Sequence, residues 1–374
     1  MSLRLRRIET SKSLVRRSNL PFLGGQTLSA DPVNRVPILS LAPMQDVSVL
    51  PLWRCLERRG GPDLYVTEYF RVHNHSTPEK KILQSIRGIS DHKPVAGQMI
   101  GNSPPHLVRT AQFIEAETDC VGIDVNLGCP APRVCGKQSG GALLLDPDLI
   151  REIAFSLREV VKGSLTLKTR VGFDSPAEFD SLLELFASLP IDGLAIHGRT
   201  VREKYQSPVH TDCIARAVEA LPYPVTANGS VVSIETALAM HEATNAHGLM
   251  IGRGGIRNPW LFEQVRTTFA GGEVFHPTLR DLHVYLEELI EEVATGAAIE
   301  CDQRLVNRIK KFANYASSGI NEGAFNDQLR RSRSTEEFRA VCREHLDSDE
   351  PMPSDPTDDG KLFCGFRELT IATG

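Results

Sequence analysis

The chain has 374 residues, of which 41% are hydrophobic and 24% are charged, and its formal net charge is −5 at pH 7. This length exceeds what one hydrophobic core usually supports, so we expect one large domain and a smaller one. No apolar run approaches the roughly 20 residues of a membrane span, and the start of the chain lacks the apolar core of a secretory signal. We therefore expect a cytoplasmic protein without a membrane partner.

Residues 1–35 are a basic N-terminal extension. Its first 17 residues carry six lysines and arginines against the single acid Glu9. The segment is polar and rich in arginine, and we expect it to be loosely held.

Residues 36–272 alternate short apolar runs with segments whose apolar residues are spaced by three and four. The strand-like runs are 38–42, 64–67, 95–100, 122–127, 165–171, 193–197, 225–228 and 248–251. Eight alternating units over roughly 240 residues predict an α/β fold, the (β/α)8 TIM barrel. The alternative is a doubly wound open sheet, which would show a G-x-G-x-x-G turn where this chain has Ala42-Pro43-Met44.

Beyond residue 272 the strand pattern stops. Apolar spacing predicts helices over 279–290, 305–315 and 338–346, so we expect residues 273–346 to form a smaller all-helical domain. Residues 347–374 are an acidic, proline-containing tail, which we expect to be extended or disordered. The apolar stretch Leu362–Phe366 is a candidate for holding this tail against the body.

A cysteine stands at the end of the fourth strand-like run. Gly128 and Pro130 end the run 122–127 and leave Cys129 at its carboxyl end. Most free cysteines are small buried hydrophobes, but a thiol between two helix breakers is favoured to be reactive. The eight cysteines include no C-x-x-C pair and no zinc spacing, so we expect reduced thiols and no metal.

The carboxyl ends of the strands should converge on one mouth of the barrel, where the active sites of such barrels lie. The residues at these ends are Ala42, Pro43, Met44, Glu68, Gln98, Asn126, Cys129, Lys168, Arg170, His197, Arg199, Asn228, Gly229, Gly252 and Arg253. Two ends are glycine turns, 228–230 and 252–255. Either turn alone would be explained by a tight loop, but two of them at the usual phosphate position of a barrel favour a phosphorylated ligand.

Lys168 lies in an otherwise apolar strand. Burying an ammonium is costly without an anionic partner. A reduced flavin carries such a charge at the pyrimidine end of its ring, so Lys168 indicates a flavin site. His197 is a candidate donor to the same ligand, although a lone histidine is more often structural.

Basic residues gather on one predicted helix of the C-terminal region: Arg304, Arg308, Lys310 and Lys311. A charged helix face is most often merely solvated. A clustered basic face can still bind phosphates in a protein that is acidic overall, so this helix is a candidate nucleic-acid contact.

Together these motifs resemble the tRNA-dihydrouridine synthase family over residues 37–346. The most specific match is Asn126-Leu-Gly-Cys-Pro-Ala-Pro-Arg-Val134 with Gly140-Gly-Ala-Leu-Leu144. Supporting matches are 42–44, 67–68, 98–101, 168–172, 197–200, 227–229, 251–254 and 258–262. The helix around Arg308–Phe312 is similar to the bacterial C-type branch, which acts on the D-loop of tRNA.

The resemblance implies an FMN-binding barrel followed by a helical tRNA-binding domain, with Cys129 as the catalytic acid. It assigns FMN binding to Ala42, Pro43, Met44, Gln98, Lys168, His197, Asn228, Gly229, Ser230, Gly252 and Arg253. Contacts to the substrate and tRNA would come from Glu68, Asn126, Arg170, Arg199, Tyr205, Arg304, Arg308, Lys310 and Lys311. Cys135 has no counterpart role. The chain departs from the family pattern at Ser230, where an acid is usual, and over Gln206–Asp212.

The implied reaction reduces a uridine of tRNA to 5,6-dihydrouridine. NADPH reduces FMN, which passes a hydride to carbon 6 of uracil, while Cys129 gives a proton to carbon 5. The base must first leave the RNA stack, which explains the need for an RNA-gripping domain. Two alternatives stay open: an FMN barrel acting on a free pyrimidine or enone, and a non-catalytic RNA-binding relative. A monomer is the default expectation.

Overall fold

The structure, a computed structural model, describes residues 36–89, 93–297, 301–358 and 362–371. The predicted N-terminal extension, residues 1–35, lies outside the described residues. Within those ranges, no helix is long and apolar enough to cross a bilayer. The same ranges contain no group of three or more His, Cys, Asp or Glu side chains that could hold a metal ion.

Eight parallel strands close into a barrel. They are β1 (Ile38–Leu41), β2 (Leu64–Val66), β4 (Val95–Ile100), β5 (Gly122–Asn126), β6 (Ser164–Arg170), β7 (Gly193–His197), β8 (Val225–Asn228) and β9 (Gly248–Ile251). β1 pairs with both β2 and β9, and β2 pairs in turn with β4, so the ring is closed. The predicted barrel is confirmed and the open sheet is excluded. A short strand, β3 (Phe70–Arg71), adds a pairing along β4.

The strands were readable in the sequence because both faces of each are buried. All six residues of β4 and all five of β5 are buried. Parallel strands covered on both faces appear as continuous apolar runs rather than as alternating ones. Each strand therefore begins and ends within one or two residues of its predicted run.

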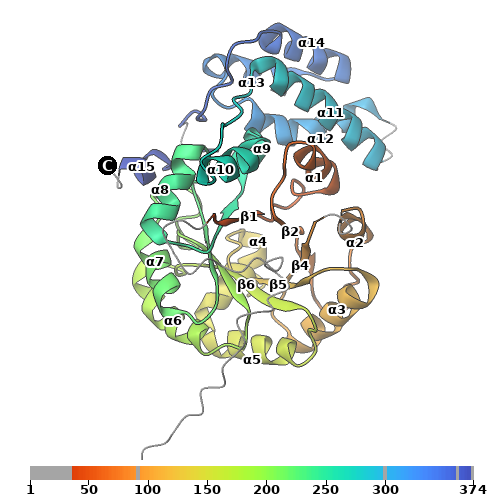
Figure 1. The fold of residues 1–374 in the computed structure, drawn as a ribbon. Coiled ribbons are helices and arrows are strands. Elements are labelled where there is room, and N and C mark those ends of the chain that lie inside the picture. The colour runs from red at the N-terminus through yellow and green to blue at the C-terminus, as the bar shows by residue number, and fades with distance from the viewer. Residues whose placement is uncertain (1–35, 90–92, 298–300, 359–361, 372–374) are drawn as a thin grey trace, which may run out of the picture.

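A ring of helices surrounds the barrel (Figure 1). They are α1 (Leu50–Glu57), α2 (Lys80–Arg87), α3 (Pro104–Glu117), α5 (Pro147–Arg158), α6 (Phe179–Ala187), α7 (Thr211–Ala220), α8 (Ile234–Thr244) and α10 (Leu261–Phe269), with the shorter α4 (Pro132–Cys135) and α9 (Arg253–Arg257). Their starts follow local signals. The Asp146 carboxylate accepts from Leu149 N at 3.1 Å to cap α5, and Ser233 forms a capping box with Thr236 at the start of α8.

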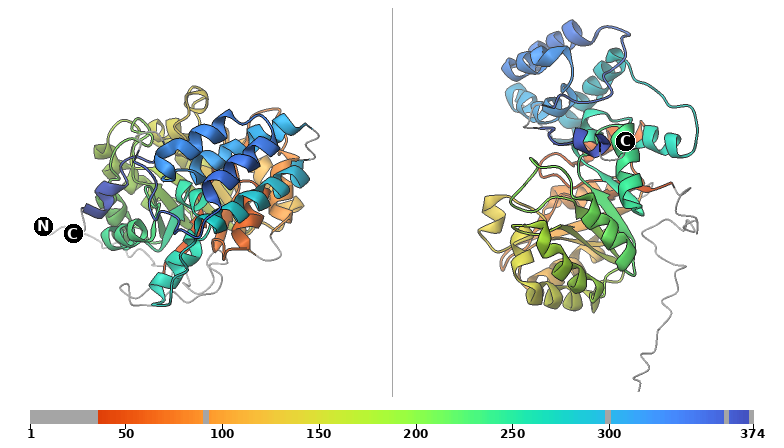
Figure 2. Two further views of the ribbon diagram at one scale, coloured as in Figure 1. Left: turned by 90° about the horizontal axis from the view of Figure 1, so that it is seen from above. Right: turned by 90° about the vertical axis from the view of Figure 1, so that its left-hand side faces the viewer.

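Four further helices form a layer above the barrel in Figure 1, which the right-hand view of Figure 2 also shows. They are α11 (Leu279–Ala297), α12 (Asp302–Ala316), α13 (Ala324–Arg331) and α14 (Thr335–Leu346). The three predicted helices are confirmed as α11, α12 and α14, whereas α13 was not predicted. α11 packs on α1, and α12 packs on α9. Buried side chains of both parts form one continuous cluster, so the domain boundary at residue 272 stays a prediction.

The C-terminal tail is held against the body where the structure describes it. Leu279 N donates to Glu350 O at 2.9 Å, and Met352 N donates to Pro277 O at 2.8 Å. The buried guanidinium of Arg257 donates to the carbonyls of residues 318 and 353–355. Residues 347–358 form no helix, in line with an extended tail, and these bonds hold them against the body. The prediction for Leu362–Phe366 is confirmed, because Phe363 and Phe366 are buried against Val232, which lies between β8 and α8. The helix α15 (Arg367–Ile371) follows and packs on α8.

Candidate active site

The barrel brings the predicted mouth residues of four neighbouring strands together. Asn126 of β5 stands in register with Lys168 of β6, and Arg170 stands in register with His197 of β7. His197 is in turn in register with Asn228 of β8. This grouping follows from the closed barrel, because all its strands end at the same mouth.

Cys129 lies on a turn directly after β5. Asn126 Oδ1 accepts from Gly128 N at 3.1 Å and from Cys129 N at 2.9 Å. On the other side, the carbonyl of Cys129 accepts from Gly141 N at 3.0 Å and from Cys135 Sγ at 3.4 Å. Both the N–H and the carbonyl of Cys129 are therefore fixed by hydrogen bonds. The residue is partly exposed.

Lys168 and Arg170 are cations on the mouth side of β6. Lys168 Nζ donates to Asn228 Oδ1 at 3.0 Å. Burial, followed by the charge of Arg170, lowers the pKa of Lys168 to about 8. The Arg170 guanidinium donates to carbonyls of two loops, Gly128 O at 2.7 Å and Lys204 O at 2.7 Å. These bonds hold the loops that bear Gly128 and Lys204, and a contact between Arg170 and the substrate stays a prediction.

His197 is buried at the mouth. Burial, together with the charges of Arg170 and Lys168, lowers its pKa well below 6.5, so the imidazole is neutral at physiological pH. Its Nδ1 atom is buried with no hydrogen-bond partner among the described residues. Tyr205 meets the ring edge-on at 5.9 Å between centroids, and the Tyr205 ring also lies 5.2 Å from the Arg170 guanidinium and 4.9 Å from that of Arg253.

The turns after β8, β9 and β1 lie close together. Gly229 has φ +129°, a left-handed value that favours glycine. A Cβ atom at Gly252 would lie 3.4 Å from Ala42 Cβ and 3.7 Å from Met44 Sδ. The predicted segment Ala42-Pro43-Met44 is therefore next to the predicted phosphate turn.

The stretch Leu362–Phe366, here named the C-terminal strap, reaches these turns. Leu362 O accepts from Arg253 Nη1, and Cys364 O accepts from Arg199 Nη2 at 3.3 Å. The Ser230 hydroxyl accepts from Arg199 at 2.8 Å and donates to Gly365 O at 3.3 Å. Arg199 is fully buried, and its Nη1 has no partner among the described residues. The sequence indicated that the strap returns to the body but not that it ends at this site.

The remaining predicted residues lie on or near α12. Glu68 is buried, which raises its pKa, and it accepts from Asp46 N. Asp46 also pairs with Lys81 at 3.7 Å and with Lys311 at 3.6 Å. Lys310 Nζ donates to Arg330 O at 2.9 Å and to Ser332 O, so it caps the end of α13. The contact between Lys310 and tRNA stays a prediction.

Arg304 and Arg308, the other two predicted cations of α12, keep more solvent contact. Arg304 is exposed and Arg308 is half-buried. Both are therefore placed where a large anionic partner could reach them.

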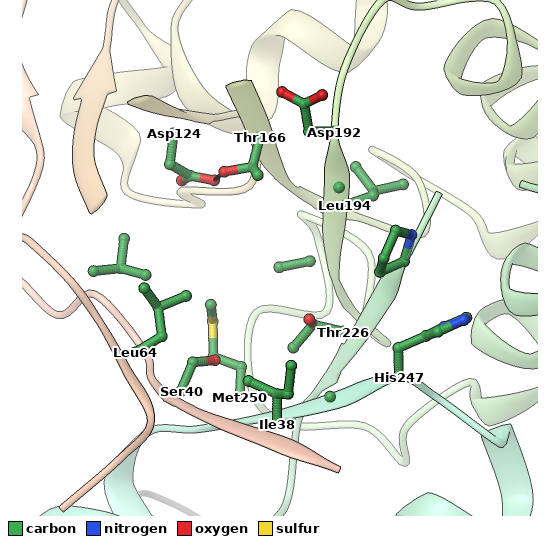
Figure 3. A pocket seen from close by; sticks show the side chains of 15 residues that line it. Ile38, Ser40, Leu64, Asp124, Thr166, Asp192, Leu194, Thr226, His247 and Met250 are labelled. Carbon is green, nitrogen blue, oxygen red and sulfur yellow. Dashed lines mark hydrogen bonds between the residues drawn. The ribbon is translucent and has the colours of Figure 1, made fainter. Parts of the chain in front are cut away.

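A pocket extends into the barrel from the opposite, amino-terminal end of the strands (Figure 3). Ile38, Leu64 and Gly248 line its outer part, and Asp124 and Thr166 line its inner part. Asp124 is a buried carboxylate that the sequence analysis did not single out. The signal was present, because Asp124 interrupts the apolar run between Ile123 and Val125.

Comparison with known proteins identifies the family. The chain matches the dihydrouridine synthase (Dus) family model over residues 40–349. It is 32% identical over 247 residues to tRNA-dihydrouridine synthase B of Xanthomonas axonopodis pv. citri, which covers 66% of this chain and 74% of that protein. It is 28% identical over 319 residues to tRNA-dihydrouridine synthase B of Xanthomonas campestris pv. campestris, which covers 85% of this chain and 95% of that protein.

A relative with a different name matches almost as well, namely the tRNA-dihydrouridine(16) synthase of Haemophilus ducreyi, at 31% identity over 64% of this chain and 76% of that protein. Solved structures match less closely, for example histamine dehydrogenase from Rhizobium sp. 4-9 at a TM-score of 0.48 and 14% identity, over 68% of this chain and 49% of that chain. These identities do not assign the chain to one branch, so the C-type branch stays a prediction. The family itself is clear: this chain belongs to the dihydrouridine synthases.

Proposed function

We propose that this chain is a flavin-dependent oxidoreductase that uses FMN and NADPH to reduce a uridine of tRNA to 5,6-dihydrouridine. The observation that carries the proposal is Cys129 on a fixed turn at the barrel mouth, next to the strands that bear Lys168 and His197. Family membership supports the same reaction. When bound, the flavin supplies the hydride for the uracil ring.

The residues at the mouth fit a phosphorylated flavin. Lys168, Arg199 and Arg253 bring positive charge, and Lys168 and Arg199 donate hydrogen bonds to uncharged oxygens of Asn228, Ser230 and Cys364. His197 Nδ1 and Arg199 Nη1 are buried polar atoms without partners in the described part of the chain, and such atoms normally bind something. A ligand with anionic and acceptor groups would satisfy them.

The site residues divide into two groups by position. Lys168 and His197 would bind the ring from the mouth side of β6 and β7, and Gln98 would bind it from within β4. The phosphate would bind at the glycine turns, through Asn228, Gly229, Ser230, Gly252 and Arg253, with Ala42, Pro43 and Met44 beside them. Ser230 stands where the family usually has an acid, and its hydroxyl already binds Arg199.

Cys129 would donate the proton to carbon 5 of uracil. Its turn fixes the backbone on both sides, so the thiol has a defined position from which to act. A positioned general acid contributes about 10²- to 10⁴-fold to such a step. Asn126, which holds this turn, and Tyr205, whose ring packs beside His197 and Arg170, would contact the base.

The tRNA contact is proposed for α12 and its surroundings, with Arg304 and Arg308 as the principal cations and Lys311 beside Asp46. We further propose that the protein acts as a cytoplasmic monomer. The free cysteines agree with a reducing compartment.

The absorbance spectrum of the purified protein tests the flavin, and turnover of tRNA against free uridine tests the substrate. We expect a yellow protein that consumes NADPH with tRNA and not with free uridine, and loss of dihydrouridine in tRNA from a deletion strain. Flavin-free protein that cannot be reconstituted with FMN would refute the cofactor. Equal turnover of free uridine would favour the small-substrate alternative.

A further inference from the structure

A buried carboxylate lies one layer below the barrel mouth. Asp124 is 5% exposed and belongs to β5, the strand that leads to Cys129. It accepts from Gln98 Nε2 at 2.7 Å through Oδ2 and from Thr166 Oγ1 at 2.7 Å through Oδ1. Figure 3 shows the contact between Asp124 and Thr166 at the inner end of the pocket. The proposed reaction uses neither the Asp124 nor the Thr166 side chain directly.

Two amide side chains connect Asp124 with the turn of Cys129. Gln98 Nε2 donates to Asp124, and Gln98 Oε1 accepts from Asn126 Nδ2 at 2.9 Å. Asn126 Oδ1 then accepts from Gly128 N at 3.1 Å and from Cys129 N at 2.9 Å. Asp124, Gln98 and Asn126 are buried, and Cys129 at the end of this chain of hydrogen bonds is partly exposed.

The direction of these bonds is fixed at both ends. An ionised carboxylate only accepts hydrogen bonds, and a backbone N–H only donates them. Because Asp124 takes the NH₂ group of Gln98, the Gln98 oxygen must face Asn126, and the Asn126 oxygen must then face the backbone of Cys129. If either amide turned over, two donors or two acceptors would meet in a buried site, which costs about 1–3 kcal/mol for each unsatisfied group.

We propose that Asp124 is a positioning residue for the Cys129 thiol, acting as the acceptor that sets the orientation of Gln98 and Asn126. This inference rests on the proposed function in one respect, namely that Cys129 is the proton donor. Asp124 itself touches neither substrate nor cofactor in this assignment.

A second explanation for Asp124 is that it neutralises Lys168. Lys168 Nζ donates to Asn228 Oδ1 at 3.0 Å, whereas the hydrogen bonds of Asp124 go to Gln98 and Thr166. The two explanations differ in what they require. A counterion must be charged, but an acceptor for Gln98 can be a neutral amide oxygen.

Three substitutions separate these roles. Asp124→Leu removes the acceptor, and the adjoining pocket offers space for its side chain. Asp124→Asn keeps an oxygen for Gln98 Nε2 and loses the charge, while the Thr166 hydroxyl can accept from the new amide. Thr166→Val is the matched control, because it alters the same pocket and leaves the bond between Asp124 and Gln98 intact. If Asp124→Leu does not fold, Asp124→Ala replaces it.

The first measurement is the rate at which iodoacetamide alkylates Cys129, followed by peptide mass spectrometry, which needs neither tRNA nor turnover. We expect Asp124→Leu to change this rate by about fivefold or more, and Asp124→Asn and Thr166→Val to stay within about twofold. The second measurement is the rate at which tRNA restores the flavin absorbance after NADPH has bleached it. We expect a loss on the order of 10- to 100-fold in Asp124→Leu, and about threefold or less in the other two variants.

Parent-like rates in Asp124→Leu would overturn the proposal. Asp124→Asn as impaired as Asp124→Leu would show that the charge matters and not the acceptor, and an equal defect in Thr166→Val would reduce the effect to packing. If the parent enzyme does not act on tRNA, the proposed function fails, but the alkylation rates still decide the role of Asp124.

Discussion

Two cation-rich regions of this molecule differ in what surrounds their charges. At the barrel mouth, burial lowers the pKa of Lys168 to about 8 and that of Arg199 to about 10, and both side chains donate to uncharged oxygens. On α12, Lys311 is 3.6 Å from Asp46, and the two side chains are 45% and 46% exposed. The Lys310 ammonium donates a hydrogen bond to Arg330 O at the end of α13.

This difference separates two kinds of anion site. Cations that are desolvated and paired with neutral groups retain their charge for a ligand, and salt screens them little. Exposed cations are screened by mobile salt ions over a Debye length of about 8 Å, so their binding to a polyanion depends strongly on salt. The mouth suits one fixed, small anion, whereas α12 suits the weaker contacts of a long nucleic acid.

The largest expected effect is at the thiol of the mouth. Cys129→Ala should bind FMN and be reduced by NADPH at a near-normal rate, because that step needs no proton donor to uracil. Reoxidation by tRNA should slow by about 10²- to 10⁴-fold. Stopped-flow absorbance measures both steps. Cys135→Ala is the control and should keep its activity; a defect in Cys135→Ala instead of Cys129→Ala would contradict the assignment.

The next largest effect is expected on the binding of FMN at the barrel mouth. Arg253→Ala should weaken FMN binding by about 10- to 100-fold, since a charged hydrogen bond is worth about 1.5–3 kcal/mol. Gly229→Val should also empty the site, because a side chain there is strained at φ +129°. Fluorescence titration with FMN measures both. Arg202→Ala, an exposed residue paired with Asp174, should bind FMN normally.

The desolvation of Lys168 gives a prediction about pH. Its folded-state pKa of about 8 lies below the ordinary 10.5, so without ligand its charge opposes folding at neutral pH. This cost fades as the pH rises from 8 towards 10.5. Lys168→Met should therefore raise the free energy of unfolding of the flavin-free protein at pH 7 by about 1–3 kcal/mol. Urea denaturation at pH 7 and 9.5 tests this, and a less stable variant at pH 7 would contradict it.

The smallest effects are expected on α12. Arg304→Ala with Arg308→Ala should lower the slope of log affinity for tRNA against log salt by about one unit per lost phosphate contact. FMN reduction by NADPH should not change. Lys310→Ala should keep the slope and instead lose about 1 kcal/mol of stability, because it caps α13. An unchanged slope in the double variant would move the tRNA footprint away from α12.

The sequence predicted the barrel and most of its mouth for one physical reason. Strands buried on both faces are mostly apolar, so β4 and β5 stand out in the chain. A closed parallel barrel then gathers the carboxyl ends of its strands at one mouth. Cys129, Lys168 and His197 could therefore be grouped without coordinates. The roles of these residues came from the family resemblance and remain to be tested.

Only the tertiary structure decided which partner each buried polar group has. A guanidinium can donate either to a phosphate or to a backbone carbonyl, and the sequence does not show which of them it meets. Arg199 binds Cys364 O across 165 positions of the chain, and Arg257 binds Asp355 O across 98. Asp124 likewise shows its connection to Cys129 only in the folded structure, where the side chains of Gln98 and Asn126 link the two residues by hydrogen bonds. Local pattern determines which segments are buried, but hydrogen-bond partners far apart in the chain depend on the packing of the whole fold.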